Sequence, residues 1–258
     1  MLQKVLTFFI FIFLGLRISS SLQGQILQQD SSDNIFLINI GYGGYQPGGD
    51  LSTRFGYTNL AGGEIGYQFK SNFYFTGGMY FLFGGVVKEP NHLINLRYDG
   101  FTILNYNGQP AEIRVWERGY TVPLRVGWVL PRFDPFRANA NSGPYIETGV
   151  QFIQHKIRIE NVGNLVPSLS SQYLKGYDRL TNGIGVMQSV GYRYYSLNKL
   201  INFFVAVDIM ENFTENRRDF QYDQEKVENK KRLDLMMGFR AGWTIPLYQI
   251  NKSSIFYY

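Results

Sequence analysis

The stretch LDLMMGFRAGWTIPL, residues 233–247, decides the fold of this chain. Its odd positions are apolar from Leu233 to Leu247, whereas its even positions are mostly small or polar, as at Asp234, Arg240 and Thr244. A period of two places alternate side chains on opposite faces of a β-strand. The stretch therefore predicts one long strand with an apolar face and a polar face.

The same alternation recurs along the chain, and no helical period persists over a long window. It predicts strands at about residues 35–43, 57–69, 73–87, 113–130, 144–158, 180–195, 200–212 and 232–248. Most of these reach the nine to eleven residues, roughly, that a strand needs to cross a membrane. We therefore predict an all-β fold, an eight-stranded antiparallel transmembrane up-and-down β-barrel.

The lengths of the connections indicate an orientation. Long, polar segments alternate with the short turns 70–72 and 196–199. The long segments are residues 44–56, 88–112, 159–179 and 213–231. Outer-membrane barrels have short periplasmic turns and long extracellular loops, so we expect extracellular long loops and periplasmic termini. The connection 131–143 is longer than a periplasmic turn should be and is a candidate contact surface.

The first residues are typical of a cleaved signal peptide. Lys4 supplies a charge, residues 5–16 form an apolar core, and small residues follow up to Gly24. The alternative is a transmembrane helix, but the apolar stretch is short and Arg17 interrupts it. We predict a signal peptide at 1–24 and an outer-membrane β-barrel at 25–258.

Composition supports a membrane protein and excludes several classes. The chain is 17% aromatic and only 17% charged, as expected when much of the surface faces lipid. The net charge of +5 is spread along the chain, which argues against nucleic acid as a partner. The absence of cysteine excludes disulfides, thiolate metal sites and a lipoprotein anchor.

Aromatic residues cluster near the predicted strand ends, as in the girdles that anchor barrels at headgroup level. The predicted periplasmic girdle contains Tyr67, Phe69, Phe73, Trp128, Tyr192, Tyr194, Trp243 and Tyr248. The alternative is a soluble barrel of the lipocalin kind, with its apolar face inward. The glycine-rich polar face suits a narrow interior better than a solvated exterior, so the membrane interpretation is favoured.

If the apolar face meets lipid, the polar face lines the lumen. The predicted lumen network contains Glu64, Glu117, Arg125, Glu147, Gln151, His155, Arg193, Asp208, Asp234 and Arg240. About eight strands leave room only for side chains, and unpaired buried charges are costly. We therefore predict paired charges, a closed interior and no wide aqueous channel.

Few residues are candidates for catalysis or metal binding. Glu147, Gln151 and His155 share one strand face, and a rim histidine could serve an enzyme that modifies envelope lipid, but the parity of His155 points inward. His92 lies near Glu89 in a long loop, and a chain with only 2 His offers little for a metal. We expect no catalytic residue, metal or cofactor. The mixed-charge segment 213–231 is either a solvated loop or a surface for polysaccharide or a partner.

The whole mature chain resembles small outer-membrane β-barrel proteins of the Bacteroidota, the group that includes PorT-like components of type IX secretion. Its last strand carries Arg240, Gly242, Ile245 and Leu247, similar to the barrel-assembly signal of such Gram-negative envelope proteins, although this chain continues to Tyr258. The segment 175–183 is also similar to barrels of that group. The resemblance implies lipid and lipopolysaccharide as surroundings and the barrel-assembly machinery as a partner during insertion.

We therefore expect an integral outer-membrane protein that is not an enzyme. The first hypothesis is a structural or accessory subunit of a larger secretion or assembly complex, in contact with other outer-membrane proteins. The alternatives are a lipid-modifying enzyme that uses His155 and a small-solute porin.

Overall fold

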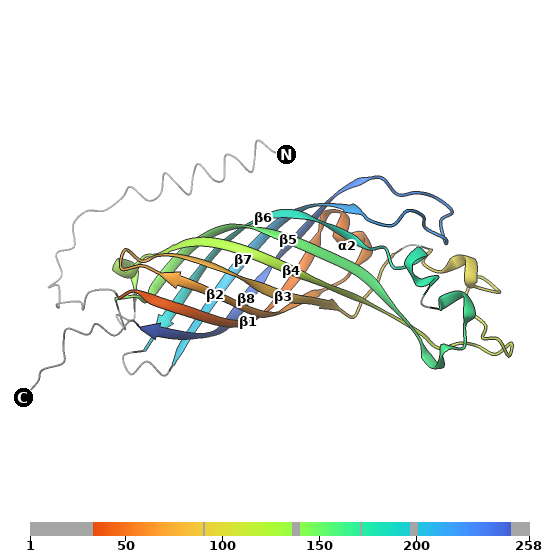
Figure 1. Cartoon of the computed structure of the whole chain (residues 1–258), viewed down its shortest axis with the longest axis horizontal. Helices are drawn as coiled ribbons and strands as arrows, with labels where there is room; N and C mark the ends of the chain where they lie inside the picture. Colours follow the sequence, from red (N-terminus) through yellow and green to blue (C-terminus); the bar gives the residue numbers. More distant parts are fainter. Residues whose placement is uncertain (1–32, 90, 136–139, 171, 197–200, 249–258) are drawn as a thin grey trace, which may run out of the picture. The chain divides into compact units, whose positions relative to one another are not determined.

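The computed structural model describes residues 33–89, 91–135, 140–170, 172–196 and 201–248, and its described strands form one closed antiparallel ring (Figure 1). The strands are β1 Ile35–Gly48, β2 Thr58–Gln68, β3 Phe73–Gly84, β4 Ile113–Val129, β5 Gly143–Asn161, β6 Thr181–Tyr195, β7 Asn202–Asn216 and β8 Lys231–Tyr248. Each strand pairs with the next, and β8 pairs with β1. The predicted up-and-down barrel is confirmed. The predicted signal peptide and the tail after Tyr248 lie outside the described residues.

The register of the strands sets the slant of the barrel. One row of paired residues leaves β1 at Ile38 and returns to β1 at Gly48, ten residues further along. The row passes through Ile65, Gly77, Leu124, Val150, Val186, Glu211 and Leu235. That offset tilts the strands by about 40°, the usual range for a membrane barrel, and leaves an interior that side chains can fill.

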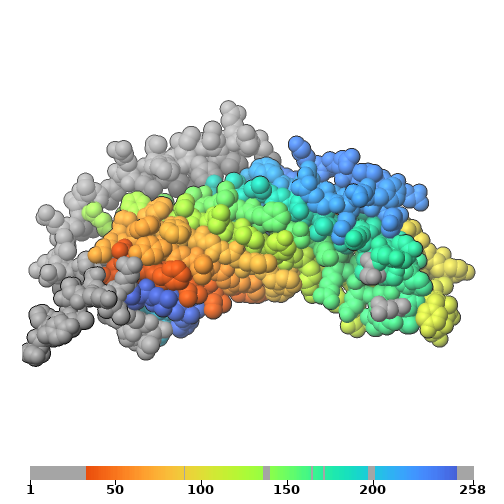
Figure 2. Space-filling view, viewed as in Figure 1, coloured from red at the N-terminus to blue at the C-terminus, as the bar shows by residue number. Residues whose placement is uncertain are grey.

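The outer face of the wall is apolar. Every strand contributes large exposed hydrophobic side chains, among them Ile40, Ile65, Met79, Leu124, Val150, Val190, Ile209 and Phe239. On β4 this surface runs from Trp128 to Tyr120, about 26 Å of strand at ~3.3 Å per residue, or about 20 Å of height at that tilt. Such an apolar band is far larger than a water-soluble protein exposes. The barrel therefore crosses a membrane, and Figure 2 shows its wall as a continuous surface.

No helix among the described residues is long and apolar enough to cross a membrane.

Long connections gather at one end of the ring, which we call the loop end; the other is the turn end (Figure 1). The short helix α2, Gly49–Arg54, follows β1. The other long connections join β3 to β4, β5 to β6 and β7 to β8, and they contain the 3-10 turns η2 Ile94–Leu96, η4 Val162–Asn164, η5 Pro167–Leu169 and η6 Leu174–Gly176.

The largest difference from the predicted elements lies in β1, which continues to Gly48 rather than ending near residue 43. The glycines of this segment suggested a strand end. They instead lie where tyrosine rings pack closely, because a Cβ at Gly43 would meet the Tyr45 ring at 2.7 Å and one at Gly44 would overlap the Tyr57 side chain.

The connection 131–143 folds back onto the turn end. It begins with the 3-10 turn η3, Pro131–Phe133, and the Tyr192 hydroxyl donates to Asp134 at 2.5 Å. Near its far end Asn141 donates to the Asp33 carbonyl at 3.0 Å. The described part of this connection therefore packs against the barrel, with Phe133 exposed.

The structure corrects one member of the predicted aromatic girdle. Phe69, Phe73, Trp128 and Trp243 are exposed, and Tyr67, Tyr192 and Tyr194 are partly exposed at outward positions. Tyr248 has the opposite parity, because even positions of β8 face inward, and it packs against Ile35, Leu37 and Tyr195. The prediction that Tyr248 belongs to the girdle is wrong, because the parity of β8 places this ring on the inner side of the barrel.

Candidate functional site

Five charged side chains from five strands meet across the interior; we call them the central cluster. They are Glu64, Arg125, Glu147, Asp208 and Arg240. Arg240 lies 2.9 Å from both Glu147 and Asp208, and Arg125 lies 2.9 Å from Glu147 and 3.0 Å from Glu64. Each of these side chains is at most 3% exposed. The cluster therefore ties the walls together through the middle of the barrel.

Neutral donors complete this cluster, since three carboxylates face only two guanidinium groups. The Tyr45 hydroxyl donates to Asp208 at 2.7 Å and the Tyr74 hydroxyl to Glu147 at 2.8 Å. Thr76 donates to Glu64 at 2.8 Å. A buried ion-pair group is tolerated only when its remaining lone pairs are satisfied in this way.

Arg193 lies apart from the central cluster. Its guanidinium stacks 4.2 Å from the Tyr74 ring centre and 5.3 Å from that of Tyr145, and it donates to Gln68 at 3.4 Å. Stacking against aromatic faces stabilises a desolvated cation. The predicted lumen network is thus not one connected group, because this arginine is held mainly by rings.

Between the central cluster and the loop end, the interior is largely apolar. Leu60, Leu82, Ile153, Met187, Met210 and Met236 are buried there, joined by Leu51 of α2 and by Phe55, which follows it. The prediction of a polar lumen omitted this layer. The parity of these positions is inward, but their side chains are apolar, so a prediction based on polar side chains passes over this layer.

The remaining predicted lumen residues form short, separate contacts. His155 lies 3.0 Å from Asp234, which also accepts from Thr214 at 2.5 Å. The other contacts are Thr58 with Glu117 at 2.6 Å and Gln151 with Asn212 at 2.7 Å. The His155 ring is wholly buried and lies nearly perpendicular to the Phe55 ring, with the two ring centres 5.5 Å apart. His155 therefore faces α2 and the interior, away from lipid.

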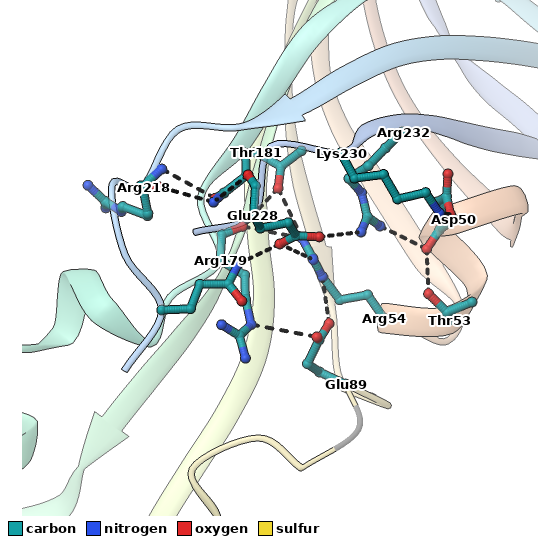
Figure 3. Close-up of polar contacts among 12 residues, drawn as sticks. Asp50, Thr53, Arg54, Glu89, Arg179, Thr181, Arg218, Glu228, Lys230 and Arg232 are labelled. Carbon is teal, nitrogen blue, oxygen red and sulfur yellow. Dashed lines mark hydrogen bonds and ion pairs between the residues drawn. The ribbon is translucent and has the colours of Figure 1, made fainter. Parts of the chain in front are cut away.

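A second charged group closes the loop end (Figure 3); we call it the mouth cluster. Its members are Arg54, Glu89, Arg179, Asp223, Glu228 and Arg232. Arg54 pairs with Glu89 at 2.7 Å and lies 3.5 Å from Glu228, while Arg179 pairs with Asp223 at 2.6 Å. Arg54 and Arg179 are 1% exposed. The mouth cluster therefore joins all four long connections.

Further contacts turn these connections into one packed unit, which we call the loop cap: the described residues of 49–57, 85–112, 162–180 and 217–230. Arg218 binds both oxygens of Asp178, at 2.7 and 2.5 Å, and Tyr177 packs edge-on against Tyr222. A cavity of about 460 Å³ remains, lined in part by Glu89, His92 and Arg97. The loop cap is thus an ordered surface rather than a set of separate loops.

The mouth cluster predicts an acid-sensitive loop cap. Burial acts to raise the pKa of Asp223, but the adjacent His92 ring and Arg179 outweigh it, so this pKa lies below its ordinary value. A depressed carboxyl pKa stabilises the fold above the unfolded-state pKa, about 3.9 for Asp, and that stabilisation is lost as the pH falls through the folded-state pKa. We expect hydrogen exchange in residues 217–230, corrected for intrinsic rates, to rise as the pH falls from about 5 to about 3.

The variant Asp223→Asn provides the control for this expectation. It should exchange faster already near neutral pH, because Arg179 loses its charged partner, and it should show a flatter pH dependence. An unchanged pH dependence in the variant would mean that other groups hold the loop cap.

Sequence reasoning identified the central residues by parity but missed Arg54 and Arg179. Both lie in connections, where no period applies. The positions proposed as an assembly signal lie on both faces of β8. Arg240 is buried in the central cluster, whereas Ile245 and Leu247 are exposed on the outer face. Gly242 lies where a Cβ would meet the Phe204 ring at 2.6 Å, so its small size serves packing.

No protein family and no curated protein matches the sequence. Solved structures with a similar fold include the outer membrane protein OprG from Pseudomonas aeruginosa, at 13% identity and a TM-score of 0.43, covering 86% of this chain and 99% of that one. Neisserial surface protein A is similar at 11% identity and a TM-score of 0.39, covering 80% and 95%. The attachment invasion locus protein Ail of Yersinia pestis is similar at 12% identity and a TM-score of 0.37, covering 83% of this chain and 99% of that one. Likeness of this extent concerns the fold alone.

Proposed function

We propose that this protein is an integral outer-membrane barrel of a Gram-negative envelope that acts as a structural or accessory subunit and presents its loop cap to a larger complex. The observation that carries the proposal is the contrast between a closed interior and an ordered exterior surface. The central cluster and α2 fill the barrel, while four connections pack into one cap. A surface held rigid by buried ion pairs suits a binding partner better than a solvated loop does.

The two alternative functions fit less well. A solute pore needs an open lumen, but charged side chains cross the interior and Phe55 is buried at its loop end. An enzyme acting on lipid through His155 needs that ring at the outer wall, whereas it is wholly buried inside.

Two polar residues on the outer wall favour a membrane-embedded contact. Gln188 on β6 and Glu211 on β7 are exposed at outward positions. Glu211 pairs across strands with Val186 and Leu235, and it makes no ion pair with another described residue. Polar groups facing lipid are costly unless something satisfies them. A partner protein that hydrogen-bonds Gln188 and Glu211 would remove this cost.

The test is a mild-detergent pull-down of the tagged protein from native outer membranes, read by mass spectrometry. We expect a partner at stoichiometric yield, with recovery about tenfold lower for Gln188→Leu combined with Glu211→Gln, the ratio that about 1.4 kcal/mol produces. Glu215→Gln is the matched control, because Glu215 lies on the same strand face but pairs with Arg217.

The identity of the partner decides the finer role. Co-purification of a secretion complex would support an accessory role in secretion of the PorT-like, type IX kind, and co-purification of assembly components would support a role in barrel assembly. A lone barrel in every native extract would rule out the accessory role.

A further inference from the structure

Three basic side chains gather on the outer wall just beyond the apolar band; we call them the basic triad. Arg118 of β4 faces Lys156 of β5 directly in the register, and Arg158 follows two residues further along β5. All three occupy outward positions, because the inward neighbours Glu117, His155 and Ile157 are buried. Toward the turn end the next outward side chains on β4 are Tyr120 and then Val122, which is exposed. The triad therefore lies at the loop-end surface of the membrane.

The charge of the basic triad is only partly balanced. Asp178 lies 3.7 Å from Lys156, but both of its oxygens already bind Arg218. Arg118 donates to the Glu117 carbonyl, which carries no net charge. Arg158 makes no ion pair or hydrogen bond with another described residue. By contrast, the nearby Arg114 pairs with Glu112.

The basic triad borders a cavity that has both polar and apolar walls. Its volume is about 390 Å³, and Arg118, Lys156 and Arg158 line it together with Phe81, Leu174 and Asp178. Leu174 and Asp178 belong to the connection between β5 and β6, so the cavity lies between the wall and the loop cap. Below it, Phe81 and the exposed apolar band continue toward the membrane centre.

We propose that the basic triad binds the phosphate of an anionic lipid headgroup, with the acyl chains of the same lipid lying along the apolar wall below Phe81. Guanidinium groups bind phosphate oxygens through paired hydrogen bonds, and a lysine adds a point charge. Basic residues at the membrane surface attract anionic headgroups for the same reason. The outer face of β7 differs in charge from the outer face of β4 and β5, because the acidic side chains Glu211 and Glu215 face outward there. The site thus selects one side of the barrel for an anionic lipid, and it does not depend on the accessory role.

The test uses the full mature chain in a neutral detergent, with diphosphorylated lipid A as the probe and native mass spectrometry to count bound lipid. The variant Arg118→Gln/Lys156→Gln/Arg158→Gln should bind at least about tenfold more weakly, as expected for the loss of several charge-assisted contacts. The matched control is Arg114→Gln/Arg217→Gln/Lys231→Gln. It removes the same charge at the same end and should bind within about twofold of the unchanged protein, as expected for charges outside the site.

Each outcome decides the proposal. Equal weakening in the two triple variants would mean that net charge alone attracts the lipid, and this would overturn the site. Displacement of the lipid by inorganic phosphate at equal concentration would show a site for a free anion instead. If the triple variant fails to fold, Arg158→Glu alone serves, because that exposed side chain contributes little to packing, and unchanged lipid binding by this variant would also overturn the proposal.

Discussion

Replacing Arg240 with methionine is expected to destabilise the barrel by about 3–5 kcal/mol, the cost of leaving buried charges unpaired. Arg240 is wholly inside the barrel and contacts Asp208 and Glu147, each at 2.9 Å. Arg125 is the other cation of the central cluster, and it alone would face three carboxylates. The measurement is urea unfolding of the protein in lipid vesicles, followed by loss of the compact, heat-resistant band in gel electrophoresis.

Two controls separate burial from charge. Arg114→Met removes an exposed arginine whose pair with Glu112 is about half solvent-accessible, so its cost should stay below about 1 kcal/mol. Arg240→Met combined with Asp208→Asn should recover part of the loss, because it removes one of the stranded carboxylates. If Arg240→Met and Arg114→Met lower the free energy of unfolding equally, the central cluster does not stabilise the barrel.

Replacing Arg54 with methionine is expected to open the loop cap while leaving the ring intact. Arg54 is buried and binds Glu89, Glu228 and the Thr181 hydroxyl. Loss of a buried cation strands its carboxylates, so we expect about 3 kcal/mol of local destabilisation. Limited proteinase K digestion of vesicle-embedded protein should then cut within residues 85–112 and 217–230, while the strands remain protected by lipid.

The control for Arg54 is Lys230→Met. Lys230 also contributes to the loop end, through Asp50 at 3.2 Å, but its side chain is 71% exposed, so the digestion pattern should not change. New cleavage inside the strands of Arg54→Met would show that the mouth cluster stabilises the whole barrel and not only the loop cap.

The strands could be predicted from the sequence because their side chains alternate with a period of two residues. Asp208, Asp234 and Arg240 could be placed inside the barrel because each alternates with apolar side chains of the outer face. The apolar inner layer was not predicted, because the rule assumed that inward side chains are polar. Met187, Met210 and Met236 are at inward positions but are apolar. The aromatic character of Tyr248 does not distinguish its side, because a girdle and an inner packing cluster both use aromatic rings.

The loop cap could not be predicted for a different reason. Arg54 meets Thr181 and Arg179, which are distant in sequence, and Arg179 meets Asp223 in yet another connection. Such partners are chosen by which connections the ring brings to the same end, so the contact follows from the closed fold and not from any local pattern. The mixed charge of segment 213–231 was visible, but its partners were not.

The seam between β1 and β8 has a consequence for how the chain folds. Ile35 pairs with Tyr248, so the first and last described strands complete each other. Contacts between such distant segments form slowly, because a long loop must close before any hydrogen bond offsets its entropy. Until β8 arrives, β1 has a row of unpaired backbone groups that a foreign strand can extend. Ring closure is therefore expected late in folding, and a chain truncated before β8 is expected to aggregate rather than insert.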